Sequence, residues 1–198
     1  MKSHYPLVVI GAGPAGLAAA TVAAEQGVEV ALFDQQPQPG GQIYRSIETV
    51  PPQRAAQLGE EYRRGEQLVG VLRSSGAQYF PDTRVWSLNP RREIGLVQEG
   101  RARMVTADQV LIASGAMERP VPFPGWTLPG VMNAGAGQIL FKEHGIVPVD
   151  GVVLAGSGPL LLLLAWQYLH AGVEVQALLD LTPTVNHLFA LPWLPRAL

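Results

Sequence analysis

The stretch Leu7–Gly16, which reads LVVIGAGPAG, decides the fold of this 198-residue chain. Four apolar residues run directly into Gly-x-Gly-x-x-Gly, a pattern that predicts a buried parallel strand, a tight turn and the start of a helix. Gly11 permits the sharp turn, Gly13 lets a pyrophosphate approach the backbone, and Gly16 lets the helix pack tightly on the sheet. Pro14 suits the first helical turn, whose free N–H groups would face the phosphates.

The residues that follow supply the context that this motif requires. The helix that begins at Pro14 is predicted to end at Gly27, and Val28–Phe33 is predicted as the second strand. Asp34 closes that strand, at the interval of about 20 residues typical of the motif. Its carboxylate can accept hydrogen bonds from the ribose hydroxyls of an adenosine. This order favours a nucleotide site over a glycine turn in an unrelated α/β domain.

The composition is that of a folded domain. The chain is 47% hydrophobic and 15% charged, so we expect a substantial buried core. The net charge of −2 gives no electrostatic case for nucleic acid binding. The absence of cysteine excludes disulfides, a redox-active dithiol, thiolate-held iron–sulfur clusters and a cysteine nucleophile within these residues. We predict no metal site.

Two stretches imitate membrane signals. Lys2 precedes an apolar run, as in a signal peptide, but the glycine motif accounts for the same residues. The uncharged stretch Gly151–Leu169 approaches the length of a membrane span, yet Gly156–Pro159 interrupts it. We therefore predict a strand followed by a buried helix, no membrane span, and a cytoplasmic protein.

The middle of the chain predicts a loop, a helix and several short strands. Prolines and paired glycines make Gln35–Arg45 a loop, in which Gln42 offers both a donor and an acceptor. Gln53–Ser75 has a helical period that three glycines weaken, so that it can bend or break. A strand and a small antiparallel meander are predicted at Ala77–Phe80, Thr83–Leu88, Ile94–Glu99 and Ala102–Thr106.

A further buried strand is predicted at Gln109–Ala113, followed by Ser114 and Gly115. A small residue and a glycine at the carboxyl end of a parallel strand again allow a ligand to approach the backbone. Four prolines make Arg119–Gly130 irregular. Asn133 is predicted to cap a helix that runs to about His144.

The opening motif then returns. Val153–Pro159 mirrors Val8–Pro14, and a second Gly-Val-Glu-Val follows at the same interval as the first. Asp180 closes the second strand as Asp34 closes the first, so Gly156, Gly158, Pro159 and Asp180 are candidate nucleotide-binding residues. An acid at this place disfavours a 2′-phosphate, which favours NADH or another adenine nucleotide over NADPH. Leu161 replaces the third glycine, so the alternative is a unit that keeps the fold without the ligand.

Three segments beyond the glycine motif carry a more specific resemblance, namely Pro39–Arg45, Ser114–Pro120 and Pro124–Val131. The chain resembles the two-dinucleotide-binding-domain flavoproteins, the group that includes thioredoxin and glutathione reductases. Within that group these segments are similar to the A subunit of opine oxidases and the B subunit of hydrogen cyanide synthase. The resemblance implies FAD in the first domain and a flavin that takes a hydride from a C–H bond beside nitrogen.

The same resemblance implies roles for individual residues. The pyrophosphate would lie on the first glycine turn, the adenosine ribose on Asp34 beside Gln35, and the adenine against the backbone of Val85. Gly41 and Gln42 would lie along the flavin, and Ser114-Gly115 corresponds to a Thr-Gly or Ser-Gly of the family. The complete set of predicted FAD-binding residues is Gly11, Gly13, Pro14, Ala15, Gly16, Asp34, Gln35, Gly41, Gln42, Val85, Ser114 and Gly115.

The predicted architecture is α/β, with a Rossmann-like FAD-binding domain that carries a small antiparallel meander and a second, partial Rossmann-like domain. We assign residues 1–118 to the first part of the FAD-binding domain, 119–132 to a proline-rich linker and 133–198 to an incomplete second domain. Members of the family are longer and return to the first domain through a Gly-Asp segment. No Gly-Asp pair occurs here, so we expect a fragment or a truncated product.

Three functions are consistent with these residues. The first is an FAD-dependent oxidoreductase subunit that oxidises an amino acid or opine beside an amino-acid-oxidase-like subunit. The second is an NADH-dependent flavin reductase that passes electrons to a carrier protein. The third is a catalytically silent nucleotide-binding module. No catalytic residue is assigned, because His144 and His170 fit helix ends and Glu118 and Arg119 fit a linker ion pair as well as a flavin site.

Overall fold

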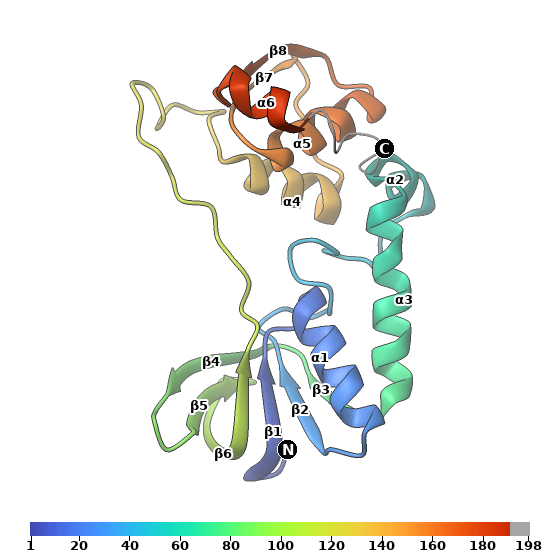
Figure 1. The fold of residues 1–198 in the computed structure, drawn as a ribbon, viewed down its shortest axis with the longest axis vertical. Helices are drawn as coiled ribbons and strands as arrows, with labels where there is room; N and C mark the ends of the chain where they lie inside the picture. Colours follow the sequence, from blue (N-terminus) through green and yellow to red (C-terminus); the bar gives the residue numbers. More distant parts are fainter. Residues whose placement is uncertain (191–198) are drawn as a thin grey trace. The chain divides into compact units, whose positions relative to one another are not determined.

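The computed structural model describes residues 1–190 of the chain, so the last eight residues of the predicted second domain lie outside the described part. The chain divides into two compact units, Met1–Met117 and Glu118–Leu198. Each unit contains its own sheet (Figure 1). Within the described range no helix is both long enough and apolar enough to cross a membrane.

The first unit contains one six-stranded sheet, in the order β3-β2-β1-β6-β5-β4. The strand β1 pairs in parallel with β2 and β6, while β4, β5 and β6 form the antiparallel meander. The elements are β1 His4–Ile10, α1 Pro14–Glu25, β2 Val30–Phe33, α2 Pro52–Leu58, α3 Glu60–Ser75, β3 Gln78–Phe80, β4 Thr83–Leu88, β5 Glu93–Gln98 and β6 Arg101–Ile112. This arrangement confirms the predicted Rossmann-like fold with a meander.

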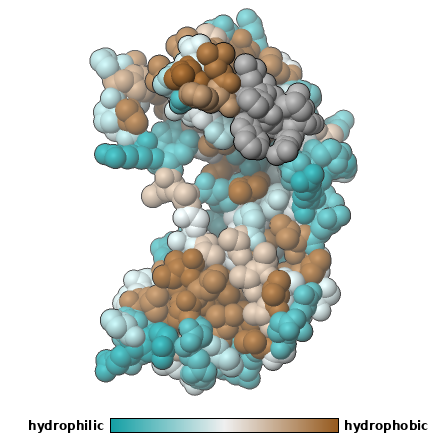
Figure 2. Space-filling view, in the orientation of Figure 1, coloured by the Kyte–Doolittle hydropathy of each residue, from teal (hydrophilic) through white to brown (hydrophobic). Residues whose placement is uncertain are grey.

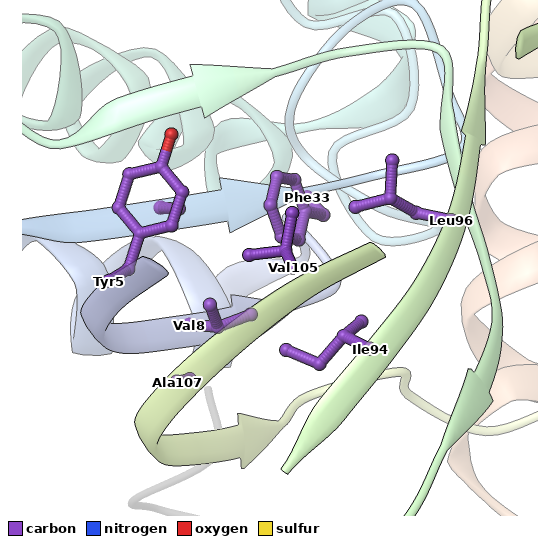
Figure 3. Close-up of a cluster of buried hydrophobic side chains, with 8 residues drawn as sticks. Tyr5, Val8, Phe33, Ile94, Leu96, Val105 and Ala107 are labelled. Atoms are coloured by element: carbon purple, nitrogen blue, oxygen red, sulfur yellow. The ribbon is translucent and has the colours of Figure 1, made fainter. Parts of the chain in front are cut away.

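The core of this unit joins the parallel strands to the meander (Figure 3). Tyr5 and Phe33 come from the parallel strands, and their rings meet edge to face with centroids 6.5 Å apart. Ile94, Leu96 and Val105 of the meander pack in the same buried cluster. Because such apolar burial is the main source of folding free energy, the meander is part of the core rather than an appendage.

Two segments that are predicted as separate strands form one strand in the structure. The predicted Ala102–Thr106 and Gln109–Ala113 form the continuous β6, which is antiparallel to β5 in its first half and parallel to β1 in its second. No glycine or proline stands between the two segments, so nothing interrupts the extended backbone.

The prediction that Gln109–Ala113 is buried was wrong. Leu111 is 39% exposed and Ile112 is 65% exposed, because they lie at the carboxyl end of β6, beyond the buried cluster. Trp86 and Met104 of the meander are also more than half exposed. Figure 2 shows apolar side chains gathered over the strands of this unit.

The predicted helix Gln53–Ser75 breaks once. The break lies at Gly59, whose φ of 95° separates α2 from α3. Side chains other than glycine rarely adopt such a φ, so this glycine ends one helix and starts the next. Gly65 and Gly70 stay within α3, and Gly76 ends it in the left-handed conformation.

The second unit repeats the strand–helix–strand arrangement. Its elements are α4 Ala134–His144, β7 Val152–Gly156, α5 Pro159–His170, β8 Val175–Asp180 and α6 Thr184–Ala190. The strands β7 and β8 pair in parallel. Phe141 of α4 and Tyr168 of α5 are buried with ring centroids 6.2 Å apart, and Gln138 donates to Gln167 at 2.9 Å between the same two helices.

The start of α4 is capped by a residue that the sequence did not indicate. Asn133 occupies the N-cap position but makes no side-chain capping hydrogen bond. Instead Oε2 of Glu118 accepts from the backbone N–H of Gly135 at 2.7 Å. A carboxylate at a helix N-terminus is favourable, because it accepts from a free N–H and faces the positive end of the helix dipole. Glu118 therefore fixes the first residue of the second unit to α4.

We predict that Glu118→Ala weakens the first turn of α4 by about 1 kcal/mol, the usual loss for a capping side chain. Amide hydrogen exchange should then be faster in this turn by about fivefold. Asn133→Ala is the matched control and should leave the exchange nearly unchanged. A larger effect from Asn133→Ala than from Glu118→Ala would contradict this assignment.

Candidate functional site

The carboxyl ends of three neighbouring strands meet at one edge of the first sheet. Ile10 of β1 lies in register with Phe33 of β2 and with Ile112 of β6. The residues that follow these strands therefore leave the sheet together. They are the glycine turn, Asp34 and the Ser114-Gly115 pair, and this edge is where open α/β sheets bind ligands.

The first glycine turn is closed by backbone contacts. A Cβ on Gly16 would collide with the carbonyl oxygen of Gly11, so α1 starts directly against the end of β1. A Cβ on Gly11 would collide with the carbonyl oxygen of Ala113, which brings the end of β6 to the same turn. Pro14 is the first residue of α1, as predicted, and Leu17 N donates to Gly13 O at 2.9 Å. The earlier N–H groups of that turn have no acceptor within the helix.

Asp34 links the second strand to the glycine turn. Its Oδ2 accepts from the backbone N–H of Ala12, and its Oδ1 accepts from Gln36 N at 2.7 Å. Its own backbone is held as well, since Thr83 N donates to Asp34 O at 2.8 Å. A carboxylate offers about four acceptor positions, so two remain for other donors such as ribose hydroxyls.

The loop after β2 lies against the same turn. Gly40 N donates to Ala12 O at 2.8 Å. A Cβ on Gly41 would lie 2.8 Å from the Cα of Gly13, which leaves no room for a side chain. The structure therefore brings Gly41 to Gly13 and forms a narrow cradle of bare backbone.

Helix α3 holds this loop from the other side. The ring of Tyr44 covers Gly65, where an added Cβ would lie 2.6 Å from Cδ1 of the tyrosine. Tyr62 donates its hydroxyl to the carbonyl of Arg45 at 2.6 Å, and burial raises the pKa of this phenol. Arg73 forms two hydrogen bonds of 3.1 Å with the carboxylate of Glu48. The sequence pattern alone does not indicate these contacts, although a glycine inside a helical pattern can signal close packing.

The remaining residues predicted for the first site include five that are exposed. They are Ala15, Gln35, Gln42, Ser114 and Gly115. Val85 lies in β4 opposite Leu96, and its side chain packs against the buried cluster. Because β4 begins beside Asp34, the backbone of this strand starts near the acid rather than near Gly13.

The second glycine turn shares part of this geometry. Oδ1 of Asp180 accepts from Thr182 N at 2.8 Å, which repeats the contact of Asp34 with the residue two positions on. Gly156 lies in register with Asp180. However, Gly158 has a φ of 91° where Gly13 has −73°, and Leu161 is buried where the first unit has Gly16. The two turns therefore follow different backbone paths.

The second turn is also less enclosed. A Cβ on Gly156 or Gly158 would meet no atom within 4 Å. Pro159 is the first residue of α5 and is exposed. At the far end of α5, His170 stacks on Trp166 with ring centroids 4.0 Å apart and its Nδ1 lies 2.9 Å from the Trp166 carbonyl oxygen. Over residues 1–190 no three carboxylate or imidazole side chains form a group that could hold a metal ion.

The first cradle fits an adenine dinucleotide on the evidence of its own atoms. At its base the backbone of Gly41 lies so close to that of Gly13 that a Cβ on Gly41 would be 2.8 Å from the Gly13 Cα. The N-terminus of α1 supplies N–H donors and a positive partial charge. Asp34 adds acceptors at the end of the neighbouring strand.

Residues 5–188 match the family described as pyridine nucleotide-disulphide oxidoreductase. The chain belongs to this family. Membership implies a flavin cofactor and confirms the predicted resemblance. The chain is 44% identical over its whole length to the opine oxidase A subunit of Rhizobium meliloti, and 47% identical over 91% of its length to that of Agrobacterium tumefaciens (strain Ach5). It spans 39% and 37% of these relatives.

Two further comparisons extend this finding. Hydrogen cyanide synthase subunit HcnB of Pseudomonas aeruginosa is 40% identical over 85% of the chain, which spans 37% of that protein. L-proline dehydrogenase from P. horikoshii has a TM-score of 0.69 at 19% identity, covering 89% of this chain and 35% of that one. At this identity the structural likeness shows the fold alone. The chain thus spans about two fifths of the length of the curated relatives it matches most fully.

We predict that Gly65→Ala displaces Tyr44 and lowers the free energy of unfolding by about 1 to 3 kcal/mol, as overpacking does. Because Tyr44 precedes Arg45, trypsin should also cleave after Arg45 faster in this variant, as measured by mass spectrometry. Gly70→Ala is the matched control in the same helix, since its added methyl group would meet nothing within 4 Å. That substitution should be neutral or stabilise by up to about 1 kcal/mol.

Adding Tyr44→Leu to Gly65→Ala should restore part of the lost stability, because the smaller side chain leaves room for the methyl group. If Gly65→Ala and Gly70→Ala changed the free energy of unfolding equally, the position of the Tyr44 ring would not depend on Gly65.

Proposed function

We propose that the chain binds FAD at the first glycine turn and contributes the flavin to an oxidoreductase. The convergence of Gly13, Gly41 and the carboxylate of Asp34 at one edge of the sheet supports this proposal. The pyrophosphate would lie on Gly11, Gly13 and Gly16, the ribose on Asp34, and the flavin beyond Gly41 toward Gln42 and Ser114-Gly115. Bound FAD would supply the redox chemistry, and this chain would supply position and electrostatics.

The substrate class that we propose is an amino acid or an opine, oxidised at a C–N bond. The names of the relatives support it: they include opine oxidase and hydrogen cyanide synthase subunits. The alpha subunit of sarcosine oxidase from Rhizobium meliloti is a further relative, 31% identical over 93% of the chain, which spans 20% of it. Because all of these relatives are named as subunits, we also propose that the partner is a second, amino-acid-oxidase-like subunit. The cytoplasmic location stays a prediction.

A second candidate is an NADH-dependent flavin reductase. The observation in its favour is the contact of Asp180 with Thr182 N, which repeats that of Asp34 with Gln36 N. In this reading NADH or another adenine nucleotide would bind at Gly156, Gly158, Pro159 and Asp180. The altered path at Gly158 and the bulk of Leu161 make this second site the weaker match.

The test of the first site is the visible absorption spectrum of the purified chain with and without added FAD. We expect the bands of a protein-bound flavin. Asp34→Ala should weaken FAD binding by roughly 10- to 100-fold, because it removes a charged hydrogen-bonding group at the site. Asp180→Ala, the matched substitution in the second unit, should leave FAD binding unchanged. A chain that is folded by circular dichroism but retains no flavin would refute the proposal.

The same sample distinguishes the two candidates. Bleaching of the bound flavin by NADH, abolished by Asp180→Ala, would favour the reductase. Bound flavin without bleaching would favour the subunit of an amine-oxidising complex. Nucleotide binding without any flavin reduction, by NADH or by a partner with its substrate, would leave the silent nucleotide-binding module as the function.

A further inference from the structure

Arg45 stands in a backbone segment that is held at several points. Gly41 lies on Gly13, the ring of Tyr44 covers Gly65, and the hydroxyl of Tyr62 donates to the carbonyl of Arg45 itself at 2.6 Å. Tyr44 N also donates to Gly40 O at 3.0 Å, which closes a turn over these residues. The place of Arg45 relative to the first glycine turn is therefore defined by contacts on both sides.

The side chain of Arg45 differs from the neighbouring arginines. Its Nε is buried and has no hydrogen-bond partner, the one such side-chain atom found among the described residues. By contrast Arg63, Arg64 and Arg73 lie 3.7, 2.9 and 3.1 Å from glutamate carboxylates. Native structures rarely leave a buried donor unsatisfied, and such a group calls for a ligand or another explanation.

The charge of the site makes an anion the fitting ligand. None of the residues assigned to the first site is basic, and Asp34 adds a negative charge. The pyrophosphate of a dinucleotide carries negative charge that the partial charge of one helix end balances only in part. Arg45 follows Gly41 by four residues, and Gly41 itself touches the glycine turn. A guanidinium at that place can supply the missing positive charge.

We propose that Arg45 binds an oxyanion at the first site, with Nε–H and a terminal N–H donating as a planar pair. The oxyanion is a phosphate of the bound dinucleotide or the carboxylate of a small substrate, because both present two oxygens in the geometry that the guanidinium matches. This inference rests on the proposed function in placing a dinucleotide on Gly13 and Gly41. It adds a binding residue outside the glycine motif, held in place by α3.

The test compares Arg45→Met, Arg45→Lys and, as control, Arg64→Met. Arg64 is on the exposed face of α3 and forms a surface ion pair with Glu61. The probes are FAD, ADP, riboflavin and iminodiacetate, a simple diacid with a secondary amine. Affinities are measured by titration, and thermal midpoints are measured for the whole chain without ligand.

If Arg45 binds phosphate, Arg45→Met should weaken FAD and ADP binding at least 10-fold and leave riboflavin unchanged. If it binds a substrate carboxylate, only iminodiacetate binding should weaken. Arg45→Lys should recover part of the affinity, because it keeps the charge but loses the planar pair of donors. Arg64→Met should change none of these affinities.

The measurement without ligand separates a binding role from a structural one. A donor with no partner inside the fold stabilises nothing there, so Arg45→Met should keep or raise the thermal midpoint. A clear fall in that midpoint would overturn the proposal, as would unchanged affinity for all four probes. Failure of the wild-type chain to bind FAD would instead refute the proposed function. The ADP and iminodiacetate titrations would still decide whether Arg45 binds an oxyanion.

Discussion

Close approach between backbone segments is the constraint on which the first unit depends. Helix α1 starts so near the end of β1 that Gly16 lies on the carbonyl of Gly11, and Gly41 lies on Gly13. Only residues without a Cβ can stand at these contacts. The result is a turn packed backbone against backbone, in which the first N–H groups of α1 have no acceptor within the helix. Asp34, β6 and the loop after β2 are all arranged around that turn.

Much of this could be predicted from local pattern. The turn at Gly11–Gly16, the strand that ends at Phe33 and the acid that follows are set by short-range spacing, which physical rules describe well. Helix ends at Gly76 and Gly145 were predictable for the same reason, because a left-handed residue is a local requirement.

What escaped prediction depends on contacts between distant residues. Glu118 reaches Gly135 across the proline-rich segment, and Tyr44 reaches Gly65 across a loop and a helix. The continuity of β6 is of the same kind, since the strand changes partner from β5 to β1 partway along. The alternation of apolar residues along a strand does not show which neighbouring strand it pairs with. The local pattern of Gln109–Ala113 could not show that Leu111 and Ile112 lie past the core.

The long strand β6 has a consequence for how the unit forms. Val8 pairs with Val110, roughly a hundred residues later in the chain, and no earlier segment occupies that side of β1. During synthesis the open edge of β1 must therefore wait until the end of β6 has left the ribosome. Pairing between residues so far apart in the sequence slows folding. Until it forms, the unpaired N–H and C=O groups along the edge of β1 can pair with other nascent chains. The same strand also joins the meander to the parallel strands, so this edge of the sheet cannot be completed before the last strand is made.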